Sequence, residues 1–375
     1  MTGTGLAKEA PAVTADPLFQ PITIGDVRLP NRIVMAPMGV GRSRGGVPTP
    51  AKRDYLRRRA AGGVGLIITG GTFVDDPAAS NHPLLPNMYG EDAIAAWGEV
   101  VDAVHDAGGR IMVQLMHAGA ERVPVESPDP HIGALSPSGT DGLGDHSSVA
   151  MTRAEVHAAI DAFARSAATA AHLGFDGVEI HGAHGFLIDQ FLWDRSNTRT
   201  DEYGVDRTRF ATDVIQAVRQ EVGRAMPISF RLSQWKTRDY GARVAHDPEQ
   251  LRSVVEPIAA GVDIMHVSTR RYWQPAFNGS PATLAELVKL YSGLPTITVG
   301  SVGLSGQDFE SVFAGVGAKS APLDDIRARL RANQFDLVAV GRALLGDADW
   351  VSKVRDGDTD SITEFRANSL FDGFR

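Results

Sequence analysis

Short apolar runs alternate with longer helical patterns eight times along the chain. The runs are Ile33–Met38, Val64–Gly70, Arg110–Met116, Gly177–His181, Pro227–Leu232, Val262–Val267, Thr296–Gly300 and Asp336–Gly341. They are continuous and rich in β-branched residues, which is typical of parallel strands buried on both faces. Eight such units favour an α/β fold of the (β/α)8 type, the TIM barrel, over a doubly wound open sheet with the same alternation.

A helical pattern follows nearly every run. The expected helices cover Pro50–Ala61, Glu91–Ala107, Thr152–Leu173, Asp206–Val222, Pro248–Ala260, Ala282–Tyr291, Leu323–Ala332 and Ala348–Arg355. Thr152 and Glu155 form a capping box at the start of the third helix, and Gly174 is a suitable stop for it. No linker divides the chain, so we expect one barrel domain over residues 18–375, preceded by a flexible tail of residues 1–17.

The longest connection lies between the third and fourth predicted strands. It contains residues 118–150 and is rich in Gly, Ser, Pro and Asp. A loop of this length inside a compact domain is usually functional. We therefore expect it to form a lid or side wall over the carboxyl-terminal mouth of the barrel, where the active sites of such barrels lie.

The composition excludes several classes of function. The chain has 375 residues, a formal net charge of −8 and no cysteine. An acidic chain without a block of Lys and Arg is a poor candidate for binding nucleic acid or an anionic membrane surface. Without cysteine the chain forms no disulfide, thiolate zinc site, cysteine nucleophile or cysteine-ligated iron–sulfur cluster. No membrane span or signal peptide is apparent. The cytoplasm is the expected compartment, and a homo-oligomer stays open.

Two strand ends are suited to a phosphate. The seventh predicted strand ends at Gly300-Ser301 and the eighth at Gly341-Arg342. Bare backbone N–H groups and a guanidinium bind phosphate well, and the loops after strands seven and eight are the usual phosphate site of such barrels. The alternative is a pair of tight turns without a ligand.

A polar set stands at the ends of the third, fourth and fifth strands. It consists of Gln114, His181, His184 and Arg231. An arginine at an apolar barrel mouth needs an anionic or acceptor-rich partner, which is either a ligand or a salt bridge to Glu179 or Asp176. Histidines are also zinc ligands, but no His-Glu-x-x-His motif is present, and we expect no metal.

At these positions the chain resembles the old yellow enzyme family of FMN-dependent oxidoreductases. The longest match is His181-Gly-Ala-His184-Gly, continued by residues 187–192 and by Asn197-x-Arg199-Thr-Asp-Glu-Tyr-Gly204. Asn31–Met38 is similar to the first strand of the family, Gln114-Leu-x-His117-x-Gly119 to the third, and Val340-Gly-Arg342 to the last. The resemblance covers about residues 18–356 and is most specific in the fourth-strand motif.

The resemblance implies noncovalent FMN, reduced by NADH or NADPH through flavin N5, and a small electron-poor substrate such as an activated alkene or quinone. Pro37, Met38, Gly39 and Gly71 would contact the flavin through backbone groups, and Gln114 would bind its pyrimidine edge. Arg231 would stabilise the reduced flavin near N1. The remaining roles fall to a phosphate-binding set and a substrate-binding pair. Gly300, Ser301, Gly341 and Arg342 would hold the phosphate, while His181 and His184 would donate to the substrate carbonyl.

Two positions depart from the family pattern. Family members usually carry a proton-donating Tyr two residues after the second histidine or asparagine, where this chain has Phe186. The position after Pro37-Met38 is often Thr or Cys, and here it is Gly39, which offers only backbone. We therefore expect slow reduction of simple enones unless Tyr240, Tyr272, His117 or an ordered water supplies the proton. The expected pocket residues are His117, Phe186, Trp235, Tyr272 and Trp273.

Two alternatives stay open. The same flavin site run oxidatively, as a dehydrogenase or desaturase, fits the loss of the tyrosine. A flavin-binding protein with little turnover fits the motifs for FMN but leaves the His181 and His184 pair unexplained.

Overall fold

The computed structural model describes residues 15–305 and 315–371. Eight parallel strands close into a barrel in which each strand pairs with the next along the chain, and the last pairs with the first. The strands are β3 (Ile33–Met35), β6 (Leu66–Ile68), β8 (Ile111–Met116), β11 (Gly177–His184), β12 (Ile228–Lys236), β13 (Ile264–Ser268), β14 (Thr296–Val299) and β15 (Leu337–Val340). The predicted (β/α)8 fold is confirmed.

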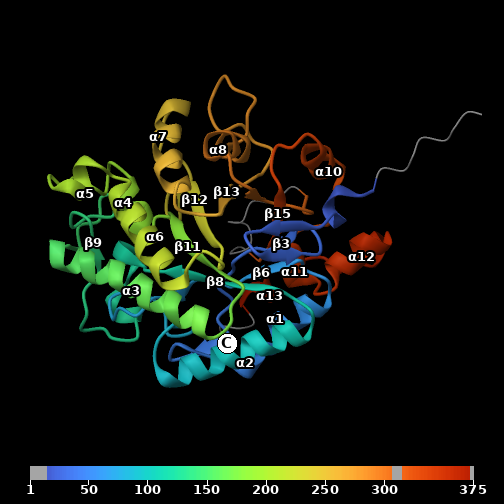
Figure 1. Ribbon diagram of the computed structural model, residues 1–375, viewed down its shortest axis with the longest axis horizontal. Coiled ribbons are helices and arrows are strands. Elements are labelled where there is room, and N and C mark those ends of the chain that lie inside the picture. The colour runs from blue at the N-terminus through green and yellow to red at the C-terminus, as the bar shows by residue number, and fades with distance from the viewer. Residues whose placement is uncertain (1–14, 306–314, 372–375) are drawn as a thin grey trace, which may run out of the picture.

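Helices surround the strands (Figure 1). The longer ones are α1 (Pro50–Ala61), α2 (Glu91–Asp106), α3 (Arg153–His172), α6 (Arg209–Val222), α7 (Pro248–Ala259), α8 (Leu284–Ser292), α10 (Asp324–Arg331) and α12 (Trp350–Asp356). Short helices are α4 (Leu187–Leu192), α5 (Glu202–Val205), α11 (Arg342–Gly346) and α13 (Asn368–Phe371). The capping box at Thr152 is formed, because its hydroxyl accepts from Glu155 N–H and the Glu155 carboxylate accepts from Thr152 N–H.

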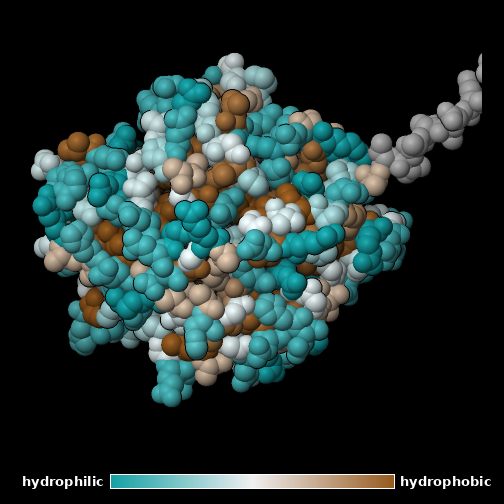
Figure 2. All heavy atoms as spheres, viewed as in Figure 1, coloured by the Kyte–Doolittle hydropathy of each residue, from teal (hydrophilic) through white to brown (hydrophobic). Residues whose placement is uncertain are grey.

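The apolar core has two parts. The larger part lies between the strands and the helices, and the smaller part fills the barrel interior. A hairpin that the sequence patterns did not reveal, β1 (Ile22–Ile24) and β2 (Val27–Leu29), adds Ile24 and Leu29 to the interior part. On the face shown in Figure 2, hydrophobic residues gather near the middle, over the strands, while hydrophilic residues cover the outer helices.

β11 and β12 are both longer than predicted. They continue to His184 and Lys236, past the expected ends at residues 181 and 232, and residues 184 and 236 are paired across the two strands. The extensions contain glycine and polar residues, so they lack the apolar signature of the buried runs. The extension of β11 carries His184, one of the expected substrate-binding residues, and that of β12 carries Trp235; both line the cavity described below.

The long loop after β8 forms a side wall but does not line the main cavity. It contains two short 3-10 turns at residues 119–121 and 124–126 and the two-residue strands β9 (Leu135–Ser136) and β10 (Val149–Ala150). The loop packs against α4 and against the segment after β12. Ala120 N–H donates to the Gln190 side chain on α4, and Arg238, just after β12, pairs with Glu121 and Asp141. Of the two expected roles, a lid or a side wall, the structure agrees with the side wall.

Three small elements complete the chain. β4 (Ser43–Arg44) and β5 (Val47–Pro48) form a hairpin, and β7 (Thr72–Phe73) adds to β8 beside the barrel. Residues 1–14 of the predicted tail lie outside the described residues. Asp16 and Pro17, at its end, are held in place, because Arg327 on α10 donates to the Asp16 carboxylate at 2.9 Å and Pro17 begins a 3-10 turn.

Candidate active site

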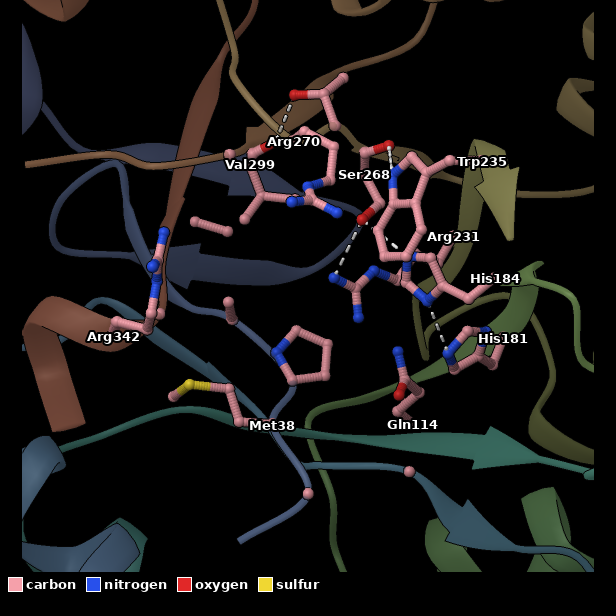
Figure 3. Close-up of a pocket in the computed structure, with 18 of the residues that line it drawn as sticks. Met38, Gln114, His181, His184, Arg231, Trp235, Ser268, Arg270, Val299 and Arg342 are labelled. Carbon is pink, nitrogen blue, oxygen red and sulfur yellow. Dashed lines mark hydrogen bonds between the residues drawn. The ribbon is translucent and has the colours of Figure 1, made fainter. Parts of the chain in front are cut away.

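A cavity of about 480 Å³ opens at the carboxyl ends of the barrel strands (Figure 3). Its volume is typical of a site for one small molecule or cofactor. The ten expected cofactor-binding residues all line it, namely Pro37, Met38, Gly39, Gly71, Gln114, Arg231, Gly300, Ser301, Gly341 and Arg342. The expected substrate-side residues His181, His184, Phe186 and Trp235 line the same cavity. Strands far apart in the sequence thus bring the motifs together.

The backbone between His181 and His184 has an unusual conformation that only certain residues permit. A Cβ on Gly182 would lie 2.1 Å from the Phe230 ring, so only glycine lets β11 pass over that ring. The register between β11 and β12 shifts between residues 182 and 184. His184 has a positive φ of 69°, which is uncommon for a residue with a side chain and costs about 1–3 kcal/mol.

Three contacts hold His184 in this conformation. Its N–H donates to the Ser233 hydroxyl at 2.9 Å, and its carbonyl accepts from the Thr237 hydroxyl at 2.7 Å. The next residue, Gly185, donates its N–H to the Asp189 carboxylate, which Lys236 also binds at 2.6 Å in a fully buried ion pair. The strained backbone at His184 is therefore held by hydrogen bonds at residue 184 and at the next residue, as is typical of functional sites.

The two histidine rings converge at the substrate end of the cavity. His181 Nε2 lies 3.3 Å from His184 Nδ1, and the rings are nearly perpendicular. Burial, together with the positive charge of Arg231, lowers the pKa of His181 to about 3 and that of His184 well below its ordinary value. Both rings are therefore neutral at physiological pH, where each has one N–H to donate.

A buried polar network lies under the middle of the cavity. The Glu179 carboxylate accepts hydrogen bonds from Gln114 Nε2, the Ser229 hydroxyl and His266 Nδ1 at 2.7–2.8 Å. Burial opposes its charge, but His266, Arg231 and Ser229 hold the pKa of Glu179 at about 2. Glu179 uses one of the two N–H groups of the Gln114 amide, which leaves the second N–H and the amide oxygen for a ligand.

Arg231 is oriented toward the cavity more than toward a salt bridge. Its Nη2 donates to the Ser268 hydroxyl at 3.4 Å, and its buried Nε has no hydrogen-bond partner among the described residues. Glu179 interacts with it electrostatically, and burial lowers the pKa of Arg231 to about 10, which leaves it charged. Asp176 binds Ile111 N–H and His105 instead. A buried guanidinium with an unsatisfied N–H is suited to a ligand acceptor.

The other end of the cavity has the features expected for phosphate. A Cβ on Gly300 would lie 2.6 Å from Thr269 Oγ1, so the Gly300 backbone packs against Thr269 more closely than a residue with a side chain could. Ser301 adopts a positive φ of 56°, and Arg342 Nη2 donates to its hydroxyl at 3.3 Å. Arg342 lies opposite His181 and His184 in Figure 3. This places a cation and close-packed backbone at one end and the neutral donors at the other.

An aromatic wall stands beside the histidines. The centroid of the Trp235 ring lies 4.3 Å from that of the His184 ring and 5.3 Å from that of the Tyr240 ring. The Arg270 guanidinium carbon lies over the Tyr240 ring, 3.6 Å from its centroid. Tyr240 and Arg270 both line the cavity. Aromatic faces of this kind suit a planar ligand.

Three residues expected in the substrate pocket lie away from it. Tyr272 is buried, its hydroxyl binds Asp325 on α10, and Trp273 packs edge-on against it. The cause is a turn after β13, in which Tyr272 N–H donates to Gly300 O. The buried His117 ring accepts from Gly119 N–H and lies 3.6 Å from Asp76. None of the three lines the cavity: Tyr272 and His117 are buried in packing, and Trp273 is partly exposed.

Sequence reasoning missed other cavity residues. Ser268 at the end of β13 contacts both Arg231 and His184, while Leu85 and Met116 supply apolar wall. Met116 also explains Gly71, because a Cβ there would lie 2.8 Å from the Met116 sulfur. Ser268 could have been found, because it directly follows a predicted strand. Leu85 could not, because it lies in an irregular segment that no sequence pattern marks.

This site matches a known protein family. Residues 17–361 fit the model of the NADH:flavin oxidoreductase / NADH oxidase family. A solved morphinone reductase is 25% identical, with a TM-score of 0.78 over 96% of this chain and 94% of that chain. An old yellow enzyme homologue from Zymomonas mobilis gives the same score and identity over 94% and 96%. The chain belongs to the old yellow enzyme family.

Members of this family among curated proteins are more similar in sequence. An NADH oxidase of Thermoanaerobacter brockii is 34% identical over 92% of this chain, which spans only 52% of that protein. 12-Oxophytodienoate reductase 7 of Oryza sativa is 33% identical, with 90% and 88% of the two chains aligned. Chanoclavine-I aldehyde reductase of Penicillium roqueforti is 34% identical over 91% and 89%.

The cofactor that old yellow enzyme membership implies, FMN, fits the residues present. The cavity offers a cation and close backbone for a phosphate at one end, and in its middle the unsatisfied Arg231 Nε and the Gln114 amide oxygen for a polar ring edge. Within the described segments, no group of three or more His, Asp or Glu is arranged to hold a metal ion. No helix in that same part of the chain is long and apolar enough to cross a membrane.

Proposed function

We propose that this chain passes hydride equivalents from NADH or NADPH to a small electron-poor acceptor, such as an activated alkene or a quinone. FMN, when bound, supplies the hydride transfer between donor and acceptor. The observation that carries the proposal is the convergence of His181 Nε2 and His184 Nδ1, 3.3 Å apart, on the wall of the cavity. The pair lies opposite the phosphate-type end at Arg342 (Figure 3).

The histidine pair is suited to a carbonyl or phenolic oxygen. Both rings are neutral at physiological pH because burial and Arg231 lower their pKa values. Neutral N–H donors polarise a carbonyl and bind more strongly as negative charge develops on its oxygen. Arg231 keeps its charge beside them and would favour negative charge on the cofactor's polar edge.

The names of three relatives support a carbonyl substrate. They are reductases of 12-oxophytodienoate, chanoclavine-I aldehyde and morphinone, and each name denotes a carbonyl compound. The cavity here adds the planar faces of Trp235 and Tyr240. We therefore expect a planar or cyclic acceptor whose oxygen lies between the two histidines.

Phe186 limits which acceptors react quickly. Its ring lines the cavity and has no proton to give to the carbon beside the activating group. Of the three substitute donors considered from sequence, Tyr240 lines the cavity, whereas Tyr272 and His117 are packed elsewhere. Quinones and nitro compounds, which need no carbon acid, are expected to react better than simple enones.

The second candidate is the oxidative direction, as a dehydrogenase or desaturase. Phe186 is the observation that raises it, because the reductive direction lacks its usual proton donor at that position. In the oxidative direction the hydride would go to the flavin, and the proton of the neighbouring carbon would go to solvent or another base, because Phe186 cannot accept it. A low-turnover flavin-binding protein is disfavoured by the neutral, strained and buried histidine pair. Cytoplasmic location and a homo-oligomeric state stay predictions.

A panel of acceptors separates these candidates. The protein is reduced anaerobically and mixed with 2-cyclohexenone, a benzoquinone, a nitroaromatic compound and no acceptor. The reductase proposal expects rapid return of the oxidised-flavin spectrum with the quinone and slower return with the enone. If no acceptor restores the spectrum, and a saturated cyclic ketone instead reduces the oxidised protein, the oxidative candidate replaces it.

A further inference from the structure

The hydroxyl of Ser268 contacts both Arg231 and His184. It lies 2.7 Å from His184 Nε2, and Arg231 Nη2 donates to it at 3.4 Å (Figure 3). Ser268 is 3% exposed and stands at the last position of β13. Its hydroxyl therefore links the arginine at the middle of the cavity to the histidine at its substrate end.

The contacts of His181 fix the tautomer of its own ring. Ala183 N–H donates to His181 Nδ1 at 3.3 Å, so Nδ1 is an acceptor and the ring proton is on Nε2. That N–H points toward His184 Nδ1. Without a ligand, His184 Nδ1 accepts this hydrogen bond, and its own proton is on Nε2, donated to the Ser268 oxygen.

An oxygen acceptor between the histidines requires the opposite tautomer of His184. To donate to that oxygen, His184 must carry its proton on Nδ1, which leaves an unshared pair on the buried Nε2. A buried acceptor without a donor costs about 1–3 kcal/mol. Ser268 is the one hydrogen-bond partner of Nε2 among the described residues. Its hydroxyl can reverse from acceptor to donor, because a hydroxyl has one proton and two lone pairs.

His184 cannot move its ring to find another donor for Nε2. Ser233 and Thr237 hold its backbone N–H and carbonyl in the positive-φ conformation, and the Trp235 ring lies 4.3 Å from its imidazole. The Arg231 guanidinium uses one lone pair of the Ser268 oxygen and leaves its proton available. The proton count balances, since His184 loses one proton at Nε2 and gains one at Nδ1.

We propose that Ser268 is a positioning residue that lets His184 change tautomer and so present an N–H to a bound substrate oxygen. This inference rests on the proposed function, in which both histidines hold that oxygen. It assigns to Ser268 a role in substrate affinity and none in the chemistry of the reacting atoms. A side chain that lacks a hydroxyl at this position should weaken oxygen ligands selectively.

The test uses FMN-loaded wild type, Ser268→Ala, Ser268→Thr and the control Ser166→Ala. Ser166 is a fully buried serine on α3 whose hydroxyl accepts from Asp75 N–H, outside the cavity. Each protein is titrated with 4-hydroxybenzaldehyde, followed by the flavin spectrum. We expect Ser268→Ala to weaken binding by about ten- to a hundredfold, consistent with a lost hydrogen bond to a charged oxygen. Ser268→Thr should restore most of the affinity, and Ser166→Ala should bind as wild type does.

A second readout follows the tautomer itself. Proteins labelled with [¹⁵N]histidine report which ring nitrogen carries the proton. Adding the phenol to wild type should move the His184 proton to Nδ1, and Ser268→Ala should reduce that change. Equal phenol affinity and an equal tautomer change in wild type and Ser268→Ala would overturn the role of Ser268 alone. Failure of FMN-loaded wild type to bind the phenol would instead overturn the proposed function. Loss of FMN from both Ser268 variants would assign the hydroxyl to cofactor binding and overturn the inference.

Discussion

The Phe186 ring packs edge-on against the His181 ring, with the ring centroids 4.9 Å apart and the planes at 82°. This contact places a phenyl group directly beside the residue that is proposed to hold the substrate oxygen. A tyrosine hydroxyl at the same position would reach into the same cavity, which Phe186 lines. The substitution therefore alters proton supply without removing the histidine donors.

Phe186→Tyr should accelerate enone reduction. General acid catalysis is typically worth about 10²–10⁴ in rate, and wild type lacks an acid at this position. We expect the rate of oxidation of the reduced protein by 2-cyclohexenone to rise by at least about tenfold, while reduction by NADH or NADPH changes little. Phe186→Leu adds no hydroxyl and should not accelerate the reaction. Fast wild-type turnover that tyrosine leaves unchanged would show that another residue supplies the proton.

Arg342→Ala should weaken FMN retention. Losing one charge-assisted hydrogen bond to phosphate costs about 1.5–3 kcal/mol, or about ten- to a hundredfold in Kd. The measurement is a titration of apoprotein with FMN by fluorescence quenching, at two salt concentrations. Arg252→Ala, which removes an exposed arginine paired with Glu256 on α7, serves as the control. Equal FMN affinity in both variants would move the phosphate site elsewhere.

Replacing His181 and His184 together with Ala should abolish charge-transfer bands with phenolic ligands and leave FMN bound. A phenolate over the cofactor needs the two N–H donors, whereas the groups suited to FMN lie on other strands. Spectral titration with 4-hydroxybenzaldehyde measures the loss directly, and the FMN content of the purified variant controls for folding. Undiminished phenol affinity would make the histidines structural.

Stability should fall as the pH drops from about 7 to about 5. Burial lowers the pKa of His181 to about 3 and moves that of His184 in the same direction. In the unfolded chain both groups return to about 6.5. The unfolded state therefore binds more protons in this window, and each histidine contributes up to about 1.4 kcal/mol of stability lost per pH unit below about 6.5.

Urea unfolding at a series of pH values tests this linkage. Wild type and the double alanine variant are compared above pH 5, before most carboxylates titrate. The variant should show a shallower dependence, because the two depressed groups are gone; the buried His266, whose pKa burial also lowers, remains in both. Identical slopes would contradict the neutral, buried state assigned to the pair.

The barrel was predictable because its strands are buried on both faces. Runs such as Ile33–Met35 and Leu337–Val340 contain only apolar residues, and glycine and capping signals separate the helices. The ends of β11 and β12 were not predictable, because glycine and polar residues replace the apolar run there. The β1 and β2 hairpin was also missed, since each of its strands is only three residues long.

The site was predictable where a motif fixes the backbone. Gly182 is fixed by the Phe230 ring, which leaves no room for a Cβ, and His184 by its positive φ. Both residues belong to the His181–Gly185 motif that the sequence shows. Tyr272 and Trp273 show the limit of this reasoning, because proximity along the chain does not give the direction of a side chain after a turn. Ser268 was missed, although it directly follows a predicted strand, because its contacts join three strands and emerge only in the fold.

We infer that FMN in this cavity takes hydride from a reduced nicotinamide. To test this, the purified, FMN-loaded protein is mixed anaerobically with NADH and, separately, with NADPH, and the absorbance of the oxidised flavin is followed. We expect at least one donor to bleach the flavin completely and a quinone added afterwards to restore the colour. A yellow protein that neither donor bleaches would rule out hydride transfer from nicotinamide at this site.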